Sequence, residues 1–261
     1  MHPKGKTVII TGASAGIGAA TARVFAAAGA NVVLAARDQA RLEQIAGEFP
    51  DRTLAAPTDV TDTAAIGQLV SAAVAAYGGV DIVISNAGVG LAGPVAELSR
   101  ADFDRALAVD LFGPLALTQA ALPHLRRSGA GQLIFISSVV GLRALPYLGG
   151  YAAAKAALDR LTESLRVELR GSGVKVTLVR PGTTRTGFRD NRLGSGHELR
   201  RANTRAATPD QVAQAILRAA IREPRVAYVS FADKLTLGVS LLAPALADWI
   251  LGRTFAWEGE Q

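Results

Sequence analysis

Short apolar runs alternate with longer amphipathic stretches along this chain, and this alternation restricts the possible folds more than any other feature. Seven runs have the length and residue types of buried strands, and helical spacing of apolar residues fills most gaps between them. The predicted strands are 7–11, 32–35, 52–56, 81–85, 131–137, 175–179 and 226–230. The predicted helices are 17–28, 39–49, 63–77, 99–126, 151–170 and 209–221. Such alternation requires right-handed crossovers, so we predict an α/β fold: a doubly wound (Rossmann-type), mainly parallel seven-stranded sheet with helices on both faces.

The chain has no internal repeat and no linker-like tract, so one domain covering residues 1–261 is the expected organisation. Hydrophobic residues make up 49% of the sequence, which supplies a large core and excludes general disorder. Residues 182–208 lie outside the alternation and are polar and rich in arginine. Loops of this length are typically functional lids, so we predict a mobile substrate loop there.

The last segment, residues 233–261, is predicted to be an apolar helical tail interrupted by Pro244. Its apolar stripe comprises Leu235, Val239, Leu242, Leu246 and Trp249. The uncharged run 235–247 is shorter than the roughly 20 residues that span a bilayer. Two interpretations follow. Either the stripe packs on the core or a second subunit, or it borders the substrate entrance, favours lipophilic substrates and permits peripheral contact with a membrane.

Composition argues against several classes of function. The net charge is +6, but the arginines are scattered and no nucleic-acid-binding motif accompanies them, so no nucleic-acid partner is expected. The absence of cysteine excludes disulfides and thiolate chemistry and is compatible with the reducing cytoplasm, where we expect the protein. Neither a signal peptide nor a transmembrane segment is predicted. The three histidines, His2, His124 and His197, do not cluster, so no metal site is expected.

A glycine-rich turn separates the first predicted strand from the first predicted helix. Gly12, Gly16 and Gly18 have the spacing GxxxGxG. Glycines at such a turn allow a pyrophosphate to approach the backbone N–H groups at a helix N-terminus. Because the turn follows a buried strand, we predict a dinucleotide site rather than a simple structural turn.

The end of the second predicted strand bears on the choice of cofactor. An acidic residue there would bind a ribose 2′-hydroxyl and repel a 2′-phosphate. This chain has Ala36 and Arg37 instead, and the guanidinium fork of arginine suits a phosphate. NADP(H) is therefore the predicted cofactor, while Asp38 in the next position keeps NAD(H) as the second choice.

Tyr151 and Lys155 are four residues apart in a predicted helix, so their side chains share one face. A neighbouring ammonium stabilises a phenolate and lowers the pKa of tyrosine from its usual value of about 10. We therefore expect Tyr151 to act as an acid or base close to neutral pH. Together with the glycine turn upstream, the pair predicts a proton-transferring group beside a nucleotide.

With these residues in hand, the sequence resembles the short-chain dehydrogenase/reductase family over about residues 5–230. The ordered motifs are Thr11 to Gly18, Asp59-Val60, Asn86-Ala87-Gly88, Ser138, Tyr151/Lys155, and Pro181-Gly182 followed by Thr186. The resemblance implies that Asp59-Val60 holds the adenine, that Asn86-Ala87-Gly88 supports the sheet and the adenosine ribose, and that Thr186 touches the nicotinamide. The residues expected at the cofactor are Gly12, Ser14, Gly16, Ile17, Gly18, Arg37, Asp59, Val60, Asn86, Ala87, Gly88, Tyr151, Lys155, Pro181, Gly182 and Thr186.

The resemblance also implies a catalytic set of Ser138, Tyr151, Lys155 and Asp110. Tyr151 would give or take the proton of the substrate oxygen, and Ser138 would donate a hydrogen bond as charge develops there. Lys155 would keep Tyr151 acidic and hold the nicotinamide ribose. Asp110 stands where the family has asparagine. Its carbonyl would hold a relay water, while its carboxylate, if ionised and close, would oppose formation of the phenolate.

These expectations describe an NADP(H)-dependent oxidoreductase that moves a hydride between nicotinamide and the carbonyl or alcohol carbon of a lipophilic small molecule. Two alternatives stay open. A non-catalytic NADPH-binding sensor would keep the fold without turnover. A 3-oxoacyl thioester reductase would use loop arginines to meet an acidic carrier protein, and these are Arg185, Arg189, Arg192, Arg200, Arg201 and Arg205. The resemblance further implies a homodimer or homotetramer.

Overall fold

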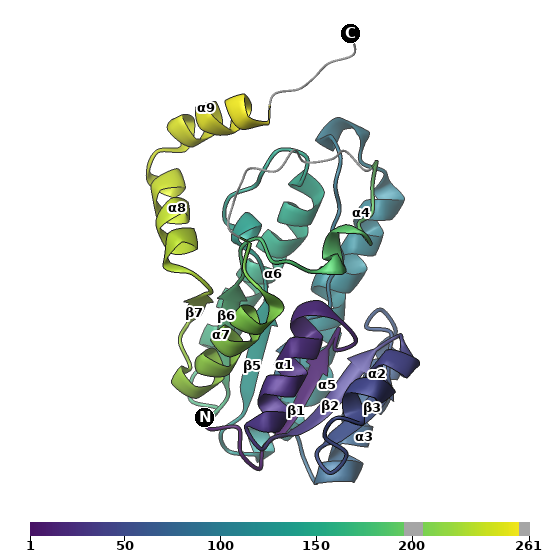
Figure 1. Cartoon of the computed structure of the whole chain (residues 1–261). Helices are drawn as coiled ribbons and strands as arrows, with labels where there is room; N and C mark the ends of the chain where they lie inside the picture. The colour runs from purple at the N-terminus through teal and green to yellow at the C-terminus, as the bar shows by residue number, and fades with distance from the viewer. Residues whose placement is uncertain (196–205, 256–261) are drawn as a thin grey trace.

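The computed structural model describes residues 1–195 and 206–255, and Figure 1 shows how their strands and helices are arranged. Seven parallel strands form one sheet in the order β3-β2-β1-β4-β5-β6-β7. They are β1 (Thr7–Thr11), β2 (Asn31–Ala36), β3 (Thr53–Pro57), β4 (Ile82–Ser85), β5 (Gln132–Ile136), β6 (Lys175–Arg180) and β7 (Val226–Tyr228). The predicted doubly wound sheet is confirmed. The strand order reverses between β1 and β4, the position at which such sheets bind ligands.

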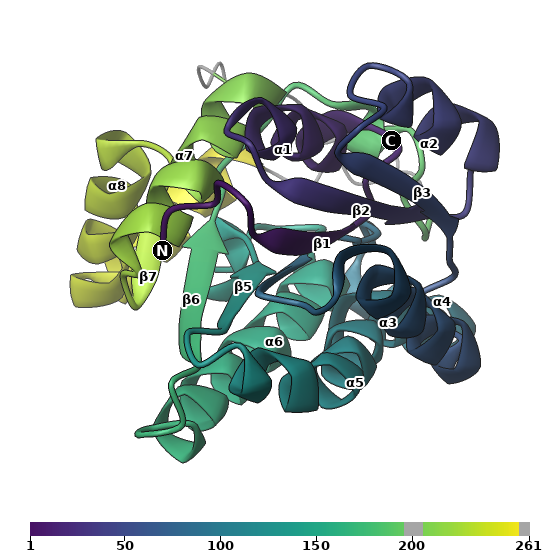
Figure 2. The ribbon, with the colours of Figure 1, turned by 90° about the horizontal axis from the view of Figure 1, so that it is seen from below.

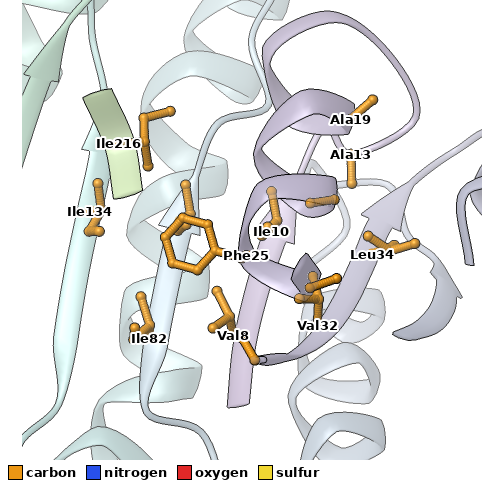
Figure 3. Packing of buried hydrophobic residues seen from close by; sticks show 14 of the residues in the cluster. Val8, Ile10, Ala13, Ala19, Phe25, Val32, Leu34, Ile82, Ile134 and Ile216 are labelled. Atoms are coloured by element: carbon orange, nitrogen blue, oxygen red, sulfur yellow. The ribbon is translucent and has the colours of Figure 1, made fainter. Parts of the chain in front are cut away.

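Helices cover both faces of the sheet, as Figure 2 shows from below. They are α1 (Gly16–Ala27), α2 (Gln39–Ala46), α3 (Thr63–Tyr77), α4 (Arg100–Leu107), α5 (Gly113–Arg127), α6 (Gly149–Glu168), α7 (Pro209–Arg222), α8 (Phe231–Leu242) and α9 (Pro244–Thr254). α1, α2 and α7 pack on one face, and α3, α5 and α6 pack on the other. In Figure 3, Phe25 of α1 lies beside Val8 and Ile10. Ile9 belongs to the opposite cluster, so β1 is buried on both faces and its sequence is a continuous apolar run.

The predicted helix at 99–126 is divided in two. A π-helical turn, Ala108–Phe112, separates α4 from α5. Pro114 has no N–H, so the carbonyl of Asp110 lacks the donor that an uninterrupted α-helix would give it, and the turn widens there. This local irregularity presents Asp110, which is fully buried, to the interior.

Two parts of the described chain meet length and composition criteria for crossing a membrane. One is the stretch Arg100–Arg127, and the other is the bent pair α8–α9 taken as one unit. The first stretch contributes Leu117, Ala121 and Leu125 to the core cluster on the face of the sheet that α3, α5 and α6 cover. Core helices commonly meet these criteria, and the packing of this stretch accounts for its apolar character.

The first part of the predicted 182–208 loop has defined structure. Residues Gly187–Arg189 form a 3₁₀ turn, and Leu193 bridges to Leu91. Arg192 packs so closely on Gly90 that a Cβ there would lie 2.6 Å from Arg192 Cγ. The remainder, including Arg200, Arg201, Arg205 and His197, lies at positions 196–205 outside the described residues. The expected mobility of this loop therefore stays a prediction.

The tail forms two helices rather than one interrupted stripe. α8 begins before residue 233 and ends at Leu242, and α9 begins at Pro244 with a bend of 114° between them. The break at Pro244 is as predicted. The predicted apolar side chains are 52–89% exposed: Leu235, Val239, Leu242, Leu246 and Trp249. They belong to neither core cluster of the described residues, and Figure 1 shows both helices outside the sheet and its covering layers.

Candidate active site

The glycine turn leaves the N-terminus of α1 open. Gly12 has a φ of 66°, and a Cβ at Gly18 would collide with the Gly12 carbonyl oxygen. The chain can fold back onto α1 only because both positions are glycine. Ala15, the N-cap of α1, provides no side-chain hydrogen bond, and the first turn has no acidic residue. The free N–H groups at this end therefore suit a pyrophosphate.

Asn86 joins this turn to the end of β4. Its Nδ2 donates to the Thr11 carbonyl at 2.9 Å. Thr11 Oγ1 accepts from the backbone N–H groups of Asn86 and Ala87, each at 3.0 Å. A Cβ on Gly88 would lie 2.8 Å from Asp110 Oδ1. The predicted structural role of Asn86-Ala87-Gly88 thus has a physical basis, and their contact with the ribose stays a prediction.

Arg37 and Asp59 lie near each other beyond the ends of β2 and β3. Hydrogen bonds from Thr61 hold the pKa of Asp59 below its usual value, and the charges of Arg37 and Arg105 lower it further. Arg37 is exposed and follows the last residue of β2. The Arg37 guanidinium is therefore available to a ligand that lies over the carboxyl ends of the strands.

Asp38 caps helix α2. Its Oδ1 accepts from the Arg41 backbone N–H at 3.1 Å, and its Oδ2 lies 3.2 Å from Arg41 Nε. Arg41 lines an open cavity of about 430 Å³ beside the glycine turn, together with Ser14 and Gly16. The carboxylate that kept NAD(H) as an option is thus engaged in capping, and two arginines border this end of the site.

Two predicted cofactor residues also have packing roles. Ile17 packs against the core cluster on the face of the sheet that α1, α2 and α7 cover. Val60 lies against the start of α5, where a Cβ on Gly113 would be 2.9 Å from the Val60 carbonyl oxygen. Both positions border the expected site, so packing and ligand contact are compatible there.

The predicted catalytic residues come together at the carboxyl edge of the sheet. Tyr151 and Lys155 lie on α6, with Lys155 Nζ 5.7 Å from the centre of the Tyr151 ring. Lys155 Nζ also donates to the Ile136 carbonyl at 3.2 Å. Ser138 follows β5, and its Oγ accepts from the Val140 N–H at 3.4 Å. Ser138 also lies close enough to the Tyr151 hydroxyl to lower its pKa.

The electrostatics of Tyr151 correct one sequence-based expectation. Burial of the phenol raises the pKa of Tyr151 to about 12, and the charge of Asp110 contributes to this rise. The expected effect of Lys155 is present and lowers the pKa, but burial outweighs it. Tyr151 is therefore a neutral phenol near pH 7 and retains its proton.

Asp110 and Lys155 form a buried ion pair. Asp110 Oδ1 lies 2.9 Å from Lys155 Nζ, and Asp110 Oδ2 accepts from the Val89 N–H at 3.4 Å. Burial alone would lower the pKa of Lys155, but the negative charge of Asp110 and the neighbouring Tyr151 raise it. Lys155 is therefore held as an ammonium. The Asp110 carboxylate is therefore close to Lys155, the arrangement expected to oppose formation of the phenolate. The relay role of the Asp110 carbonyl stays a prediction.

The chain after β6 lies across this site. Pro181 accepts a hydrogen bond from the Val139 N–H at 3.1 Å, next to Ser138. Thr186 packs on the glycine turn, where a Cβ on Gly16 would be 3.1 Å from Thr186 Cγ2. The Phe188 ring lies 5.6 Å from the Tyr151 ring, centre to centre. This segment therefore connects the glycine turn with Tyr151.

Sequence reasoning missed three residues that lie in or next to the elements carrying the site. Phe188 faces Tyr151, and Tyr147, with a φ of 64°, precedes α6 in a left-handed conformation that is rare for tyrosine. Asp159 is buried one helical turn after Lys155. Only Asp159 had a sequence signal, since a residue four positions after Lys155 shares its helix face. Within residues 1–195 and 206–255, no cluster of three potential ligands could hold a metal ion.

The fold and this arrangement define a nucleotide-dependent oxidoreductase. The sequence profile of the short chain dehydrogenases matches residues 6–194, and the chain belongs to this family. It is an oxidoreductase of CH–OH and C=O groups with a nicotinamide cofactor.

Relatives agree with this assignment. A Drosophila melanogaster protein named dehydrogenase/reductase SDR family protein 7-like is 35% identical over 95% of this chain and 80% of its own length. A short chain dehydrogenase/reductase of Burkholderia phymatum, solved with NAD, has a TM-score of 0.85 and 26% identity over 95% of this chain and 96% of its own. An alcohol dehydrogenase of Thermococcus sibiricus, complexed with 5-hydroxy-NADP, has a TM-score of 0.76 and 31% identity over 85% of this chain and 94% of its own.

Proposed function

We propose that this protein is an NADP(H)-dependent reductase of lipophilic carbonyl compounds. The observation that carries the proposal is the convergence of Ser138, Tyr151 and Lys155 at the strand ends where the open α1 N-terminus also lies. The glycine turn fits a dinucleotide, because a side chain at Gly18 would collide with the Gly12 carbonyl and one at Gly12 would collide with Asn86 and Ala87. Only glycines therefore allow the tight turn that leaves the α1 N-terminus open. The bound cofactor supplies the hydride.

The protein contributes the proton and the stabilisation of charge. Tyr151, neutral near pH 7, donates its proton to the substrate oxygen as an alcohol forms. Ser138 donates a hydrogen bond to the same oxygen while negative charge develops on it. Lys155, held as an ammonium by Asp110, stabilises the phenolate that remains on Tyr151. We assign Asp110 to the relay that returns a proton to Tyr151.

The preference for NADP(H) is supported by the charges at the end of β2. Arg37 is exposed there, Arg41 borders the neighbouring cavity, and the carboxylate of Asp38 is engaged by the α2 N-terminus. A 2′-phosphate would meet the guanidinium of Arg37 and could take the place of Asp38 as the partner of the Arg41 guanidinium. Solved relatives hold NAD in one case and an NADP analogue in another, so the local charges carry the choice.

A lipophilic substrate is supported by contacts of the tail with the site. Arg143, five residues after Ser138, forms an ion pair with Asp248 of α9. Asp233 of α8 packs on Gly182, where a Cβ would lie 2.7 Å from its Oδ1. Both tail helices are thus attached to loops of the site while presenting exposed apolar side chains.

A carbonyl panel followed by nicotinamide absorbance tests the proposal. The panel contains short and long-chain ketones and aldehydes, and 3-oxoacyl thioesters both free and on a carrier protein, each with NADPH and with NADH. We expect turnover of free apolar ketones or aldehydes with NADPH. Turnover restricted to carrier-bound thioesters would establish the acyl reductase instead. NADPH binding without turnover of any compound would establish the non-catalytic sensor.

A further inference from the structure

A second buried ion pair lies behind the first. Asp159 is on α6, one turn after Lys155, and its side chain is fully buried. Its Oδ2 accepts from Arg180 Nη2 at 2.8 Å and from Arg180 Nε at 3.2 Å. Arg180 is the last residue of β6 and is 4% exposed. Neither side chain takes part directly in the proton transfer described above, although the charge of Asp159 adds to the rise in the pKa of Lys155. Burial of two charges is costly unless they are paired, so the contacts of this pair call for an explanation.

The other carboxylate oxygen of Asp159 contacts the turn that carries Ser138. Ser137 Oγ donates to Asp159 Oδ1 at 2.5 Å, and both side chains are buried. On the far side of Ser138, a Cβ on Gly141 would lie 3.1 Å from Asp159 Oδ2 and 3.2 Å from Ser137 Oγ. Asp159 thus contacts the turn both before and after Ser138.

Arg180 connects this contact to the edge of the sheet. The next residue, Pro181, accepts the 3.1 Å hydrogen bond from Val139, which follows Ser138. Arg180 Nη1 reaches the Tyr228 hydroxyl at the end of β7 at 3.4 Å. Because the guanidinium neutralises the carboxylate, both charges can be kept in the interior. The ends of β5, β6 and β7 are therefore joined to α6 through one ion pair.

We propose that Asp159 is a positioning residue that holds the Ser138 turn against α6. The tether sets the separation at which the hydroxyls of Ser138 and Tyr151 reach one substrate oxygen. This inference rests on the proposed carbonyl chemistry, in which both hydroxyls act on the same atom. Such groups must be held within about 0.5 Å of the productive geometry. Tyr151 is fixed by its helix, whereas Ser138 lies on a turn. Backbone bonds from Ser137 and Val139 join this turn to the end of β6, and the bond from the Ser137 hydroxyl to Asp159 is its side-chain link to α6.

Ser137→Ala tests the tether without disturbing a charge, because it removes only the hydrogen bond to Asp159. We expect kcat for carbonyl reduction to fall about ten- to a hundredfold while the Kd of NADPH is unchanged. Thr162→Val is the matched control, since it removes a buried hydroxyl from α6 that donates to the Leu158 carbonyl at 2.7 Å. The control is expected to keep wild-type kcat.

A second variant addresses the ion pair itself. Asp159→Leu combined with Arg180→Met replaces both charges by apolar side chains, an exchange that often preserves stability. We expect this double variant to bind NADPH and to show at least the loss of kcat seen with Ser137→Ala. Wild-type kcat in either folded variant would overturn the proposal.

Combination with Ser138→Ala separates positioning from general packing. If Asp159 acts through Ser138, then Ser137→Ala lowers kcat less than about twofold once residue 138 is already alanine. An undiminished loss in that background overturns the proposal, and so does a crystal structure of the Ser137→Ala protein in which the Ser138 turn is unmoved. A wild-type protein that reduces no carbonyl refutes the proposed function alone, because the crystal structure still decides whether Asp159 positions the turn.

Discussion

At the scale of single residues, burial of the phenol and the charges of Lys155 and Asp110 together set the pKa of Tyr151. Asp110 keeps Lys155 charged, and it also raises the pKa of Tyr151 beyond what burial alone does. A tyrosine with a pKa of about 12 is ready to donate a proton and is poorly suited to accept one at neutral pH. Carbonyl reduction uses this protonated state, whereas alcohol oxidation requires a pH high enough to form the phenolate.

Asp110→Asn should move the pH profiles of both directions to lower pH. Removing the carboxylate removes one cause that raises the pKa of Tyr151 and one that raises the pKa of Lys155. Alcohol oxidation, which needs the phenolate, should then begin at lower pH, and carbonyl reduction, which needs the phenol, should decline at lower pH. Profiles of kcat against pH for both directions check this. Unchanged profiles would show that the Asp110–Lys155 pair does not affect the pKa of Tyr151, and inactivation would assign the carboxylate a direct chemical role.

Arg37→Ala should weaken NADPH much more than NADH. A charge-assisted contact with the 2′-phosphate contributes about 1.5–3 kcal/mol, which corresponds to roughly ten- to a hundredfold in Kd. Arg100→Ala is the control, because Arg100 is an exposed arginine that pairs with Asp104 on α4. Titration of each protein with both cofactors measures the ratio of the Kd of NADPH to the Kd of NADH. Equal weakening of NADPH and NADH by Arg37→Ala would remove the basis for the NADP(H) assignment.

At the scale of elements, the sequence predicted every strand of the sheet, because burial on both faces gives central strands such as β1, β4 and β5 continuous apolar runs that are easy to recognise. It did not predict the π turn before α5. The periodicity of residues 99–126 continues through the turn, and only the missing N–H of Pro114 marks it. It also did not predict the pairing of Asp159 with Arg180, since partners from α6 and β6 are brought together by the topology and not by spacing.

The segment after β6 gives the next prediction. Phe188 is 37% exposed, and its ring faces Tyr151. Phe188→Ala should lower kcat/KM for apolar carbonyls by up to about tenfold, since removing about 50 Å² of apolar contact area between side chain and substrate costs about 1.3 kcal/mol. Small carbonyls that do not reach Phe188 should be affected less. Val167→Ala serves as the control, because Val167 is an exposed apolar residue near the C-terminal end of α6. An equal loss for small and large substrates would place Phe188 in the folding of the loop and not in substrate contact.

At the scale of the whole molecule, the tail is attached to the site but is not part of either core cluster of the described chain. A chain that ends at Ser230, before α8, should therefore fold and bind NADPH. It should lose turnover of long-chain or polycyclic substrates while small carbonyls are still reduced. Activity measurements across a series of chain lengths, with NADPH titration as the control, check this. Equal loss for every substrate, or loss of an oligomer alone, would assign the tail to packing.

The sequence predicted the carboxyl-edge location of the site more completely than its electrostatics. The spacing of Tyr151 and Lys155 indicates a shared helix face, and the glycine turn indicates where a dinucleotide lies. The pKa of Tyr151 could not be inferred in this way, because burial by the surrounding chain outweighs the nearby ammonium. The sign of the shift depends on the packed environment of the phenol, which residue spacing does not describe.

The central claim is that Tyr151 is the proton donor of an NADPH-dependent carbonyl reductase, and Tyr151→Phe tests it most directly. The substitution removes the hydroxyl and little volume, so the Kd of NADPH should stay close to the wild-type value. Carbonyl-dependent NADPH oxidation should fall by at least about a hundredfold, because a positioned general acid contributes about 10²–10⁴-fold. Near-wild-type turnover in the phenylalanine variant, with NADPH bound as before, would contradict the account.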